Sequence, residues 1–384
     1  MGSRAEGFRE WPLRVYKRIG SYDKPDSLNA FMDAPGPLPG FTANSSFQPF
    51  PKKRVLIVGA NSYIGDSFAK YAGDRLHISI VDSYEEWKTA PFKEYDSILL
   101  VAGLAHQNWN RKKQKANKEL YFAVNRDLAI AVAKKAKACG VGQFIFLSSM
   151  AVYGLKSGEI TVDTKPAPRK NDYYGLSKYQ GENGLAMLWC KGSPTPQAPD
   201  VSRHSGLDPE SPEPLDKDWG IPGQARNDGA DVCCALNKAA PLCIIRPPMV
   251  YGPNCPGNYS KLVGLTNRMP IFPKVNNRRS MIYIDNLCAF ILYAVENDCT
   301  GAYLPQNKEH VNTTKLVQTI AAMQGKKMPI TKLLNPLISL SGKIFSPVGK
   351  LFGSLVYEHC NLEDEYNLIG FEESIRLTIN ANQL

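Results

Sequence analysis

The stretch "RVLIVGANSYIGDSFAKYAG", residues 54–73, decides the fold class of this 384-residue chain. An apolar run precedes a turn with glycines at Gly59 and Gly65, and a segment of helical periodicity follows. In such a turn, backbone N–H groups at a helix N-terminus can bind a pyrophosphate, and glycines let the main chain approach it closely. The usual middle glycine is replaced by Ser62, which tightens the space near the pyrophosphate. The stretch therefore predicts a strand, a dinucleotide-binding loop and a helix.

An acidic residue supports this interpretation. Asp82 ends the next apolar run, "HISIVD", where a carboxylate can accept hydrogen bonds from an adenosine ribose. A carboxylate there also repels a 2′-phosphate, which favours NAD over NADP. The alternative is that Asp82 caps a turn or a helix.

Three more apolar runs follow, "SILLVAG", "FIFLSS" and "LCIIRP", with helical segments between several of them. Apolar runs that alternate with helices are typical of parallel strands buried on both faces. We therefore predict an α/β fold: a doubly wound, Rossmann-like parallel sheet with a smaller C-terminal substrate-binding lobe. Only 14 residues separate Asp82 from "SILLVAG", so the usual third strand is shortened or absent.

The composition also divides the chain. Residues 1–51 have weak periodicity and form an N-terminal extension. The dinucleotide-binding domain spans 52–254 and is interrupted at 191–237 by a Pro-, Ser- and Asp-rich insertion that we expect to be disordered. The substrate-binding lobe spans 255–384, with 280–298 returning to the Rossmann domain.

The charge and the cysteines exclude several classes of protein. A formal charge of +10 suits an anionic partner such as a phosphate-bearing ligand, nucleic acid or an acidic membrane. The densest basic run, "RKKQKANKEL", lacks interleaved aromatic residues, so a solvated helix face is favoured over a nucleic-acid site.

Nine cysteines without a Cys-x-x-Cys pair, and five histidines, predict no metal site and reduced thiols in a cytoplasmic protein. There is no secretory signal or apolar run of membrane-spanning length, and "LISLSGKIFSPVGKLFGSLVY" favours packing in a lobe over lying on a membrane.

The stretch "NDYYGLSKYQGE" carries the candidate chemistry. Tyr174 and Lys178 are four residues apart, so on a helix they share a face one turn from each other. An ammonium beside a phenol lowers the pKa of the phenol towards neutrality. The chain has 18 tyrosines, so one such pair is expected by chance, and "YEEWK" is a second instance. Only Tyr174, however, follows a strand-end serine, Ser149 in "QFIFLSSM". We predict that Ser149, Tyr174 and Lys178 converge, and that Tyr173 packs or lines the substrate entrance.

These motifs, in this order, resemble the extended short-chain dehydrogenases/reductases, the nucleotide-sugar epimerase/dehydratase group. The resemblance rests on the glycine turn, Ser149, Tyr174-x-x-x-Lys178 and "RPPMVYGP" from Arg246. It implies that Ser149 binds the reacting oxygen, Tyr174 transfers its proton and Lys178 lowers the pKa of Tyr174. It implies an NAD site made by Gly59, Asn61, Tyr63, Ile64, Gly65, Asp82, Ala102 and Lys178. "RRSMIYIDNLCAF" resembles the segment in which an arginine, here Arg279, contacts the substrate phosphates.

The resemblance also narrows the reaction. The 4,6-dehydratases of this group have Thr-Asp-Glu where this chain has Ser149, Met150 and Ala151, and neither Met150 nor Ala151 can transfer a proton. The leading hypothesis is an NAD-dependent epimerase acting at C4 of a UDP-hexose for surface polysaccharide. A 4-keto-sugar nucleotide reductase and an inactive dinucleotide-binding scaffold are the alternatives. Met249 replaces the asparagine of UDP-galactose 4-epimerases, and Asn258 and Tyr259 are candidate substitutes on the substrate phosphate. The group's usual homodimer would use the helix 174–189.

Overall fold

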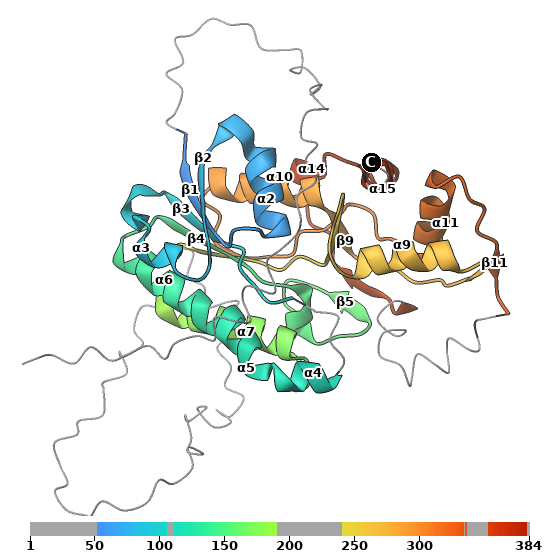
Figure 1. Ribbon diagram of the computed structural model, residues 1–384, viewed down its shortest axis with the longest axis horizontal. Helices are drawn as coiled ribbons and strands as arrows, with labels where there is room; N and C mark the ends of the chain where they lie inside the picture. The colour runs from blue at the N-terminus through green and yellow to red at the C-terminus, as the bar shows by residue number, and fades with distance from the viewer. Residues whose placement is uncertain (1–51, 106–110, 190–239, 334, 336–351, 382–384) are drawn as a thin grey trace, which may run out of the picture. The chain divides into compact units, whose positions relative to one another are not determined.

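The computed structural model describes residues 52–105, 111–189, 240–333, 335 and 352–381. The N-terminal extension and the insertion predicted at 191–237 lie outside the described residues. The described residues from Lys53 onward form one unit, and its centre is a six-stranded sheet in the order β10-β6-β4-β3-β1-β2 (Figure 1). Its strands are β1 (Arg54–Val58), β2 (His77–Val81), β3 (Ser97–Leu100), β4 (Gln143–Leu147), β6 (Leu242–Ile245) and β10 (Gly301–Tyr303).

All neighbouring strands in this sheet pair in parallel, so the prediction of a doubly wound α/β fold is confirmed. The five predicted apolar runs are β1, β2, β3, β4 and β6. The sixth strand, β10, has only three residues and no distinct apolar pattern. Among the described residues β2 is an edge strand, since residues 82–96 form short helical turns instead of a third strand: α3 (Glu86–Thr89) and η2 (Phe92–Glu94).

Alternate side chains of β1 face two separate cores. Val55 and Ile57 belong to the core cluster shared with α2 (Tyr63–Ala72) and α10 (Ile284–Glu296). Leu56 and Val58 belong to the cluster shared with α6 (Leu128–Ala138) and α7 (Tyr173–Trp189). Because side chains of a strand alternate between faces, an unbroken apolar run is what a two-sided core requires. Figure 1 shows α2 and α10 on one face of the sheet and α6 and α7 on the other.

The helical segment from α5 to α6 is not regular over its whole length. The helix α5 (Lys118–Phe122) leads into a wider turn, η3 (Ala123–Asp127), and then into α6. A widened turn inside a helix is a common feature of functional sites. α6 ends at Cys139, and Gly140 follows with a φ of 70°, as a left-handed helix cap requires.

The remaining elements lie outside the central sheet, and most of those after residue 255 belong to the lobe. Two parallel pairs join distant segments: β7 (Met249–Tyr251) with β9 (Met281–Tyr283), and β5 (Gly158–Ile160) with β12 (Leu355–Tyr357). A third pair is β8 (Phe272–Pro273) with β11 (Ile330–Thr331). The other elements are η1 (Gly73–Arg75), α4 (Arg111–Ala116), η4 (Met150–Tyr153), α9 (Asn258–Arg268), α11 (Thr313–Met323), α14 (Glu363–Tyr366) and α15 (Phe371–Ala381). Within the described residues, no helix combines the length and apolarity that crossing a bilayer would require.

Candidate active site

The glycine turn lies against the end of β3. Gly59 has a φ of 128°, which is unfavourable for any residue with a side chain. A Cβ atom at Gly59 would lie only 2.7 Å from the backbone nitrogen of Ala102. Gly65 is buried against Val101 and Ile57, so it allows α2 to pack closely on the sheet. These glycines make the close-packed turn that a pyrophosphate site needs.

Ser62 has a specific role in this turn. It precedes α2 in an extended conformation, and its hydroxyl accepts a hydrogen bond from the Gly65 N–H at 3.4 Å. It is therefore the N-cap of the helix that would face the pyrophosphate. Asn61, beside it, is exposed and has a φ of 61°. Tyr63 and Ile64 begin the helix with partly buried side chains, and the Tyr63 hydroxyl is buried without a hydrogen-bond partner in the described part of the chain.

Asp82 follows β2 and caps the next turn. Its Oδ1 accepts hydrogen bonds from the backbone N–H groups of Tyr84, Glu85 and Glu86 at 2.8, 2.9 and 3.0 Å. This is the capping role considered as the alternative. The ribose contact stays a prediction, and it would use Oδ2 of the same carboxylate.

The three predicted catalytic side chains meet at the carboxyl edge of β4. Ser149 follows the strand, and its hydroxyl accepts a hydrogen bond from the Ala151 N–H at 3.2 Å. Tyr174 is the second residue of α7 and is hydrogen-bonded to Ser149. Lys178 lies one turn further on, buried, and its Nζ donates to the Leu147 carbonyl at 2.8 Å. The serine and the tyrosine are therefore in direct contact, and the lysine is held beside the same strand end.

Lys178 also connects this group to the glycine turn. A Cβ atom at Gly103 would lie 2.8 Å from Lys178 Nζ, and Gly103 directly follows Ala102, which contacts Gly59. A side chain at position 103 would therefore displace the Lys178 ammonium from its present position. The glycine turn, the end of β3 and Lys178 thus border one continuous strip of the carboxyl edge, where doubly wound proteins bind their ligands.

The electrostatics of Tyr174 differ from the prediction. Burial raises the pKa of Tyr174, and the hydrogen bond from Ser149 only partly opposes this. Burial lowers the pKa of Lys178 to about 7, against the attraction of Glu182. The net shift of the Tyr174 pKa is therefore upward, opposite to the predicted direction, because burial outweighs the groups that lower it. The predicted effect of Lys178 on this pKa stays a prediction. Tyr173, which starts α7, is half-buried.

Sequence analysis missed Asn125, which lies in the widened turn η3. Its amide is fully buried, donates to the Leu104 carbonyl at 3.0 Å and accepts from the Leu104 N–H at 2.8 Å. It also donates to Ser177 on α7 at 3.0 Å. Asn125 thus fixes the segment after β3 relative to the helix that carries Tyr174 and Lys178. An asparagine inside an otherwise apolar helical segment was the available signal, since asparagine disfavours helix interiors.

A second polar group missed by sequence analysis is a buried ion pair below the site. Arg246 donates to Glu182 through Nη2 at 2.7 Å and Nε at 3.1 Å, and both side chains are almost fully buried. Ser148 donates to the same carboxylate, and Arg246 Nη1 donates to the Tyr153 hydroxyl at 2.8 Å. The Tyr357 hydroxyl donates to the Arg246 carbonyl at 2.7 Å. The pair therefore joins α7, the ends of β4 and β6, and β12.

Arg279, the predicted phosphate ligand, lies in the lobe. Its backbone pairs with Val311 and Leu355, and its Nη1 donates to the Gly353 carbonyl at 3.1 Å. Burial lowers the pKa of its guanidinium from the ordinary value. A partly buried arginine held by isolated β-bridges just before β9 is a suitable anchor for a phosphate. That role stays a prediction.

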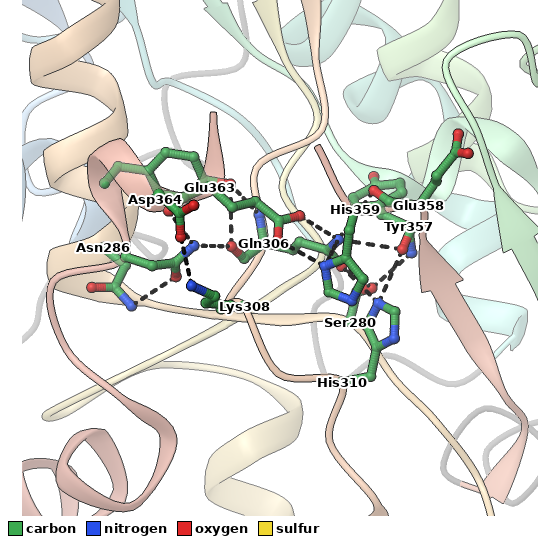
Figure 2. Close-up of polar contacts among 12 residues, drawn as sticks. Ser280, Asn286, Gln306, Lys308, His310, Tyr357, Glu358, His359, Glu363 and Asp364 are labelled. Atoms are coloured by element: carbon green, nitrogen blue, oxygen red, sulfur yellow. Dashed lines mark hydrogen bonds and ion pairs between the residues drawn. The ribbon is translucent and has the colours of Figure 1, made fainter. Parts of the chain in front are cut away.

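The strand that carries Arg279 is fixed by a buried polar network (Figure 2). Ser280 donates to Gln306 at 2.5 Å, and Gln306 donates to Glu363 at 2.7 Å. His359 contacts the same carboxylate at 2.7 Å. The Tyr357 N–H donates to Ser280 at 2.7 Å. Because Tyr357 also contacts Arg246, one chain of hydrogen bonds extends from the catalytic helix to the lobe.

The two other substrate candidates begin α9. The side chain of Asn258 lies outside the described residues. Tyr259 is 1% exposed, stacks on Tyr251 with ring centroids 5.2 Å apart, and its hydroxyl has no partner among the described residues. This placement fits a core residue better than a substrate ligand, so the substrate role of both residues stays a prediction. The described side chains also contain no group of three potential metal ligands.

Comparisons with known proteins agree with this site. Residues 55–189 match the model of the NAD dependent epimerase/dehydratase family. The chain is 23% identical over 319 residues to an N-acetyl-alpha-D-glucosaminyl-diphospho-ditrans,octacis-undecaprenol 4-epimerase of Escherichia coli O157:H7, covering 78% of this chain and 81% of that protein. It is 25% identical over 278 residues to a UDP-glucose 4-epimerase of Vibrio cholerae, covering 69% of each.

Solved structures show the same fold. A UDP-glucuronic acid 4-epimerase from Bacillus cereus, in complex with NAD, superposes with a TM-score of 0.56 at 14% identity, covering 86% of this chain and 98% of that one. A dTDP-4-dehydrorhamnose reductase ortholog from Clostridium acetobutylicum gives a TM-score of 0.58 at 16% identity, covering 86% and 100%.

The fold and the site together define a dinucleotide-dependent enzyme of the extended short-chain dehydrogenase/reductase class. Within that class, residues 55–189 match the NAD dependent epimerase/dehydratase family, as the resemblance predicted. The family match also confirms NAD as the predicted cofactor. The N-terminus of α2 after the glycine turn can bind an anionic pyrophosphate, and Lys178 lies at the same edge of the sheet, so the residues present fit a dinucleotide.

Proposed function

We propose that this protein is an NAD-dependent 4-epimerase of a hexose linked through a diphosphate to its carrier, with UDP as the first carrier to test. The observation that carries the proposal is the Ser149–Tyr174 contact beside buried Lys178, at the same edge as the glycine turn. Both curated relatives are named as 4-epimerases. The chain also has no acid–base residues after Ser149 that a dehydratase would use.

Each residue of the site would have a separate role. The glycine turn would hold the pyrophosphate of NAD, Asp82 the adenosine ribose, and Lys178 the nicotinamide ribose. Bound NAD would supply reversible oxidation of the sugar carbon C4. Ser149 would donate a hydrogen bond to the C4 oxygen, while Tyr174 accepts the hydroxyl proton as the ketone forms.

Epimerisation then needs the 4-keto sugar to rotate within the site. Tyr174 would return the same proton to the C4 oxygen after the opposite face of the carbonyl is reduced, so protons balance over the cycle. The raised pKa of Tyr174 favours the protonated phenol needed for this second step and opposes the phenolate needed for the first. The first step would therefore depend on the positive charge that Lys178 and bound NAD would place beside the phenol. Arg279 would hold the diphosphate during the rotation.

The test is to denature the purified protein, identify any released dinucleotide by absorbance and mass, and assay the native protein with UDP-glucose and UDP-N-acetylglucosamine. Retained NAD with interconversion of C4 epimers supports the proposal. An empty site that consumes NADH with a 4-keto-sugar nucleotide would instead establish the reductase. A protein that binds NAD but shows neither activity would instead support the third hypothesis, an inactive dinucleotide-binding scaffold.

A lipid diphosphate is the second carrier to test. The Escherichia coli relative is named for a substrate in which the sugar is joined by a diphosphate to undecaprenol. The lobe of this chain is rich in cations and has exposed apolar side chains, which suits such a carrier. Conversion of N-acetylglucosaminyl-diphospho-undecaprenol in detergent, without conversion of UDP-sugars, would establish this alternative.

A further inference from the structure

Two segments of the lobe are rich in positive charge. The formal net charge of the whole chain is +10. Residues 255–284 and 311–335 contain no aspartate or glutamate, and they hold nine cations: Lys261, Arg268, Lys274, Arg278, Arg279, Lys315, Lys326, Lys327 and Lys332. These two segments alone therefore contribute +9. Such a local excess produces a field that attracts an anionic surface.

Five of these cations gather at the ends of α9, α11 and the β8–β11 pair, and we call them the cationic apex: Arg268, Lys274, Lys326, Lys327 and Lys332. The Lys274 N–H donates to the Thr331 carbonyl at 2.8 Å, so Lys274 and Lys332 leave adjoining strand ends. Lys326 Nζ donates to Asn267 at 2.8 Å, which places the end of α11 beside Arg268. Figure 1 shows α9, α11 and β11 close together.

The cations of the apex are exposed, and no salt bridge joins any of them to a described carboxylate. Some exposed cations around the sheet are instead paired. Arg54 pairs with Glu94 at 3.0 Å, and Arg75 pairs with Glu296 at 2.8 Å. Cations at helix C-termini do stabilise the helix dipole, but that effect needs one cation per helix end rather than five in one place. The helix dipoles therefore do not account for five neighbouring cations, and the repulsion among these cations favours an anionic partner.

Exposed apolar side chains lie between these cations. Leu333 is 86% exposed and adjoins Lys332. Ile271 is 40% exposed and Met323 is 38% exposed, each three residues from an apex cation. Basic residues interleaved with exposed aliphatic side chains are typical of surfaces that lie on membranes. None of the large hydrophobic residues exposed in the described part of the chain is aromatic, which disfavours a single-stranded nucleic acid that would stack on such rings.

We propose that the cationic apex docks this protein on the surface of an anionic phospholipid bilayer, with Leu333, Ile271 and Met323 entering the headgroup region. The inference goes beyond the proposed reaction and is tested without measuring it, so either can fail alone. The protein remains peripheral, because the attraction is electrostatic and a few aliphatic side chains do not span a bilayer. High salt weakens the docking by screening.

The test is co-sedimentation of the full chain with vesicles of phosphatidylcholine alone or of phosphatidylcholine and phosphatidylglycerol at 3:1. We expect binding only to the anionic vesicles. A variant with Lys326→Glu, Lys327→Glu and Lys332→Glu should bind about 100-fold more weakly, since each cation near such a surface contributes roughly fivefold. Leu333→Ser should remove the binding that persists at 0.5 M salt.

The matched control carries Lys52→Glu, Lys93→Glu and Lys134→Glu, which make the same change of net charge at exposed sites in the dinucleotide-binding half. It should lose less than about threefold, because its charges are distant from the docked surface and screened. Residues 336–351 are present in every variant, so a difference between variants is attributable to the apex. Equal binding to both vesicle types, no binding to either, or equal losses in the two triple variants would overturn the proposal.

Discussion

The buried pair Glu182–Arg246 and the cationic apex use charge in opposite ways. Below the active site, one arginine is matched to one glutamate with 4% and 2% of their side chains exposed. In the lobe, five cations are exposed and lack described ion-pair partners. A buried charge must be paired because desolvation is costly, whereas an exposed charge costs little and acts at long range. The first arrangement therefore fixes geometry, and the second attracts a partner.

The comparison extends to the tyrosines. Tyr174 has a hydrogen-bonded hydroxyl beside a strip of backbone that can approach a ligand, whereas Tyr259 is enclosed in the lobe with an unpartnered hydroxyl. The same residue type is thus placed for the proposed chemistry in one region and fills a core in the other. Four experiments test these contrasts.

The largest effect is expected from breaking the buried pair. Glu182→Gln leaves Arg246 charged, buried and without a carboxylate, which should lower the free energy of unfolding by about 3–5 kcal/mol. Urea denaturation followed by circular dichroism measures the change. The control is Glu373→Gln on the exposed pair with Arg376, which should change the free energy of unfolding far less because solvent screens that pair. Similar losses in both variants would show that burial does not separate the two pairs.

The next effect concerns the two adjacent tyrosines. Tyr174→Phe removes the hydroxyl that contacts Ser149 and should lower kcat by at least ~10²-fold, because the proton transfer is lost. Tyr173→Phe should keep kcat within about threefold. Steady-state assays with the substrate identified by the cofactor experiment give both values. Full turnover in the first variant would remove Tyr174 from the mechanism.

A smaller effect is the pH dependence of stability that Lys178 causes. Its pKa is lowered by burial from 10.5 to about 7 in the folded protein, so between these values the unfolded chain binds more protons. Stability contributed by this group therefore rises with pH across that window, by up to about 1.36 kcal/mol per unit, and the penalty is complete below pH 7. Denaturation at pH 6, 7.5 and 9 should show this rise in the parent and a flatter profile in Lys178→Met. Parallel profiles would contradict the buried, partly neutral lysine.

The smallest effect separates two tyrosines of the lobe. Tyr259→Phe removes a hydroxyl without a described partner and should change the unfolding free energy by less than about 0.5 kcal/mol or increase it. Tyr251→Phe breaks hydrogen bonds to Ser374 and Asn307 and should cost about 1–2 kcal/mol. The KM of Tyr259→Phe should match that of the parent. A tenfold higher KM would instead show that Tyr259 binds substrate.

Much of the dinucleotide-binding half was predictable because its signals are local. Each central strand is an unbroken apolar run, and the glycine turn and the Tyr-x-x-x-Lys spacing are short patterns with direct steric or helical causes. β10 was missed because three partly buried residues carry no period. Asp82 was placed correctly at the end of β2, but its capping contacts depend on how the next turn folds back.

The sequence by itself determined the sheet, its glycine turn and the helix face shared by Tyr174 and Lys178, because these follow from neighbours a few residues apart. Three contacts depend on the tertiary structure and could not be predicted. They are the ion pair of Glu182 with Arg246, the hydrogen bonds of Asn125 with Leu104, and the contact of residues 268–274 with residues 326–332. Those contacts join segments separated by 21 to 64 positions in the chain. The same burial reversed the predicted effect on the Tyr174 pKa, since desolvation depends on the whole packed environment and not on the spacing of two residues.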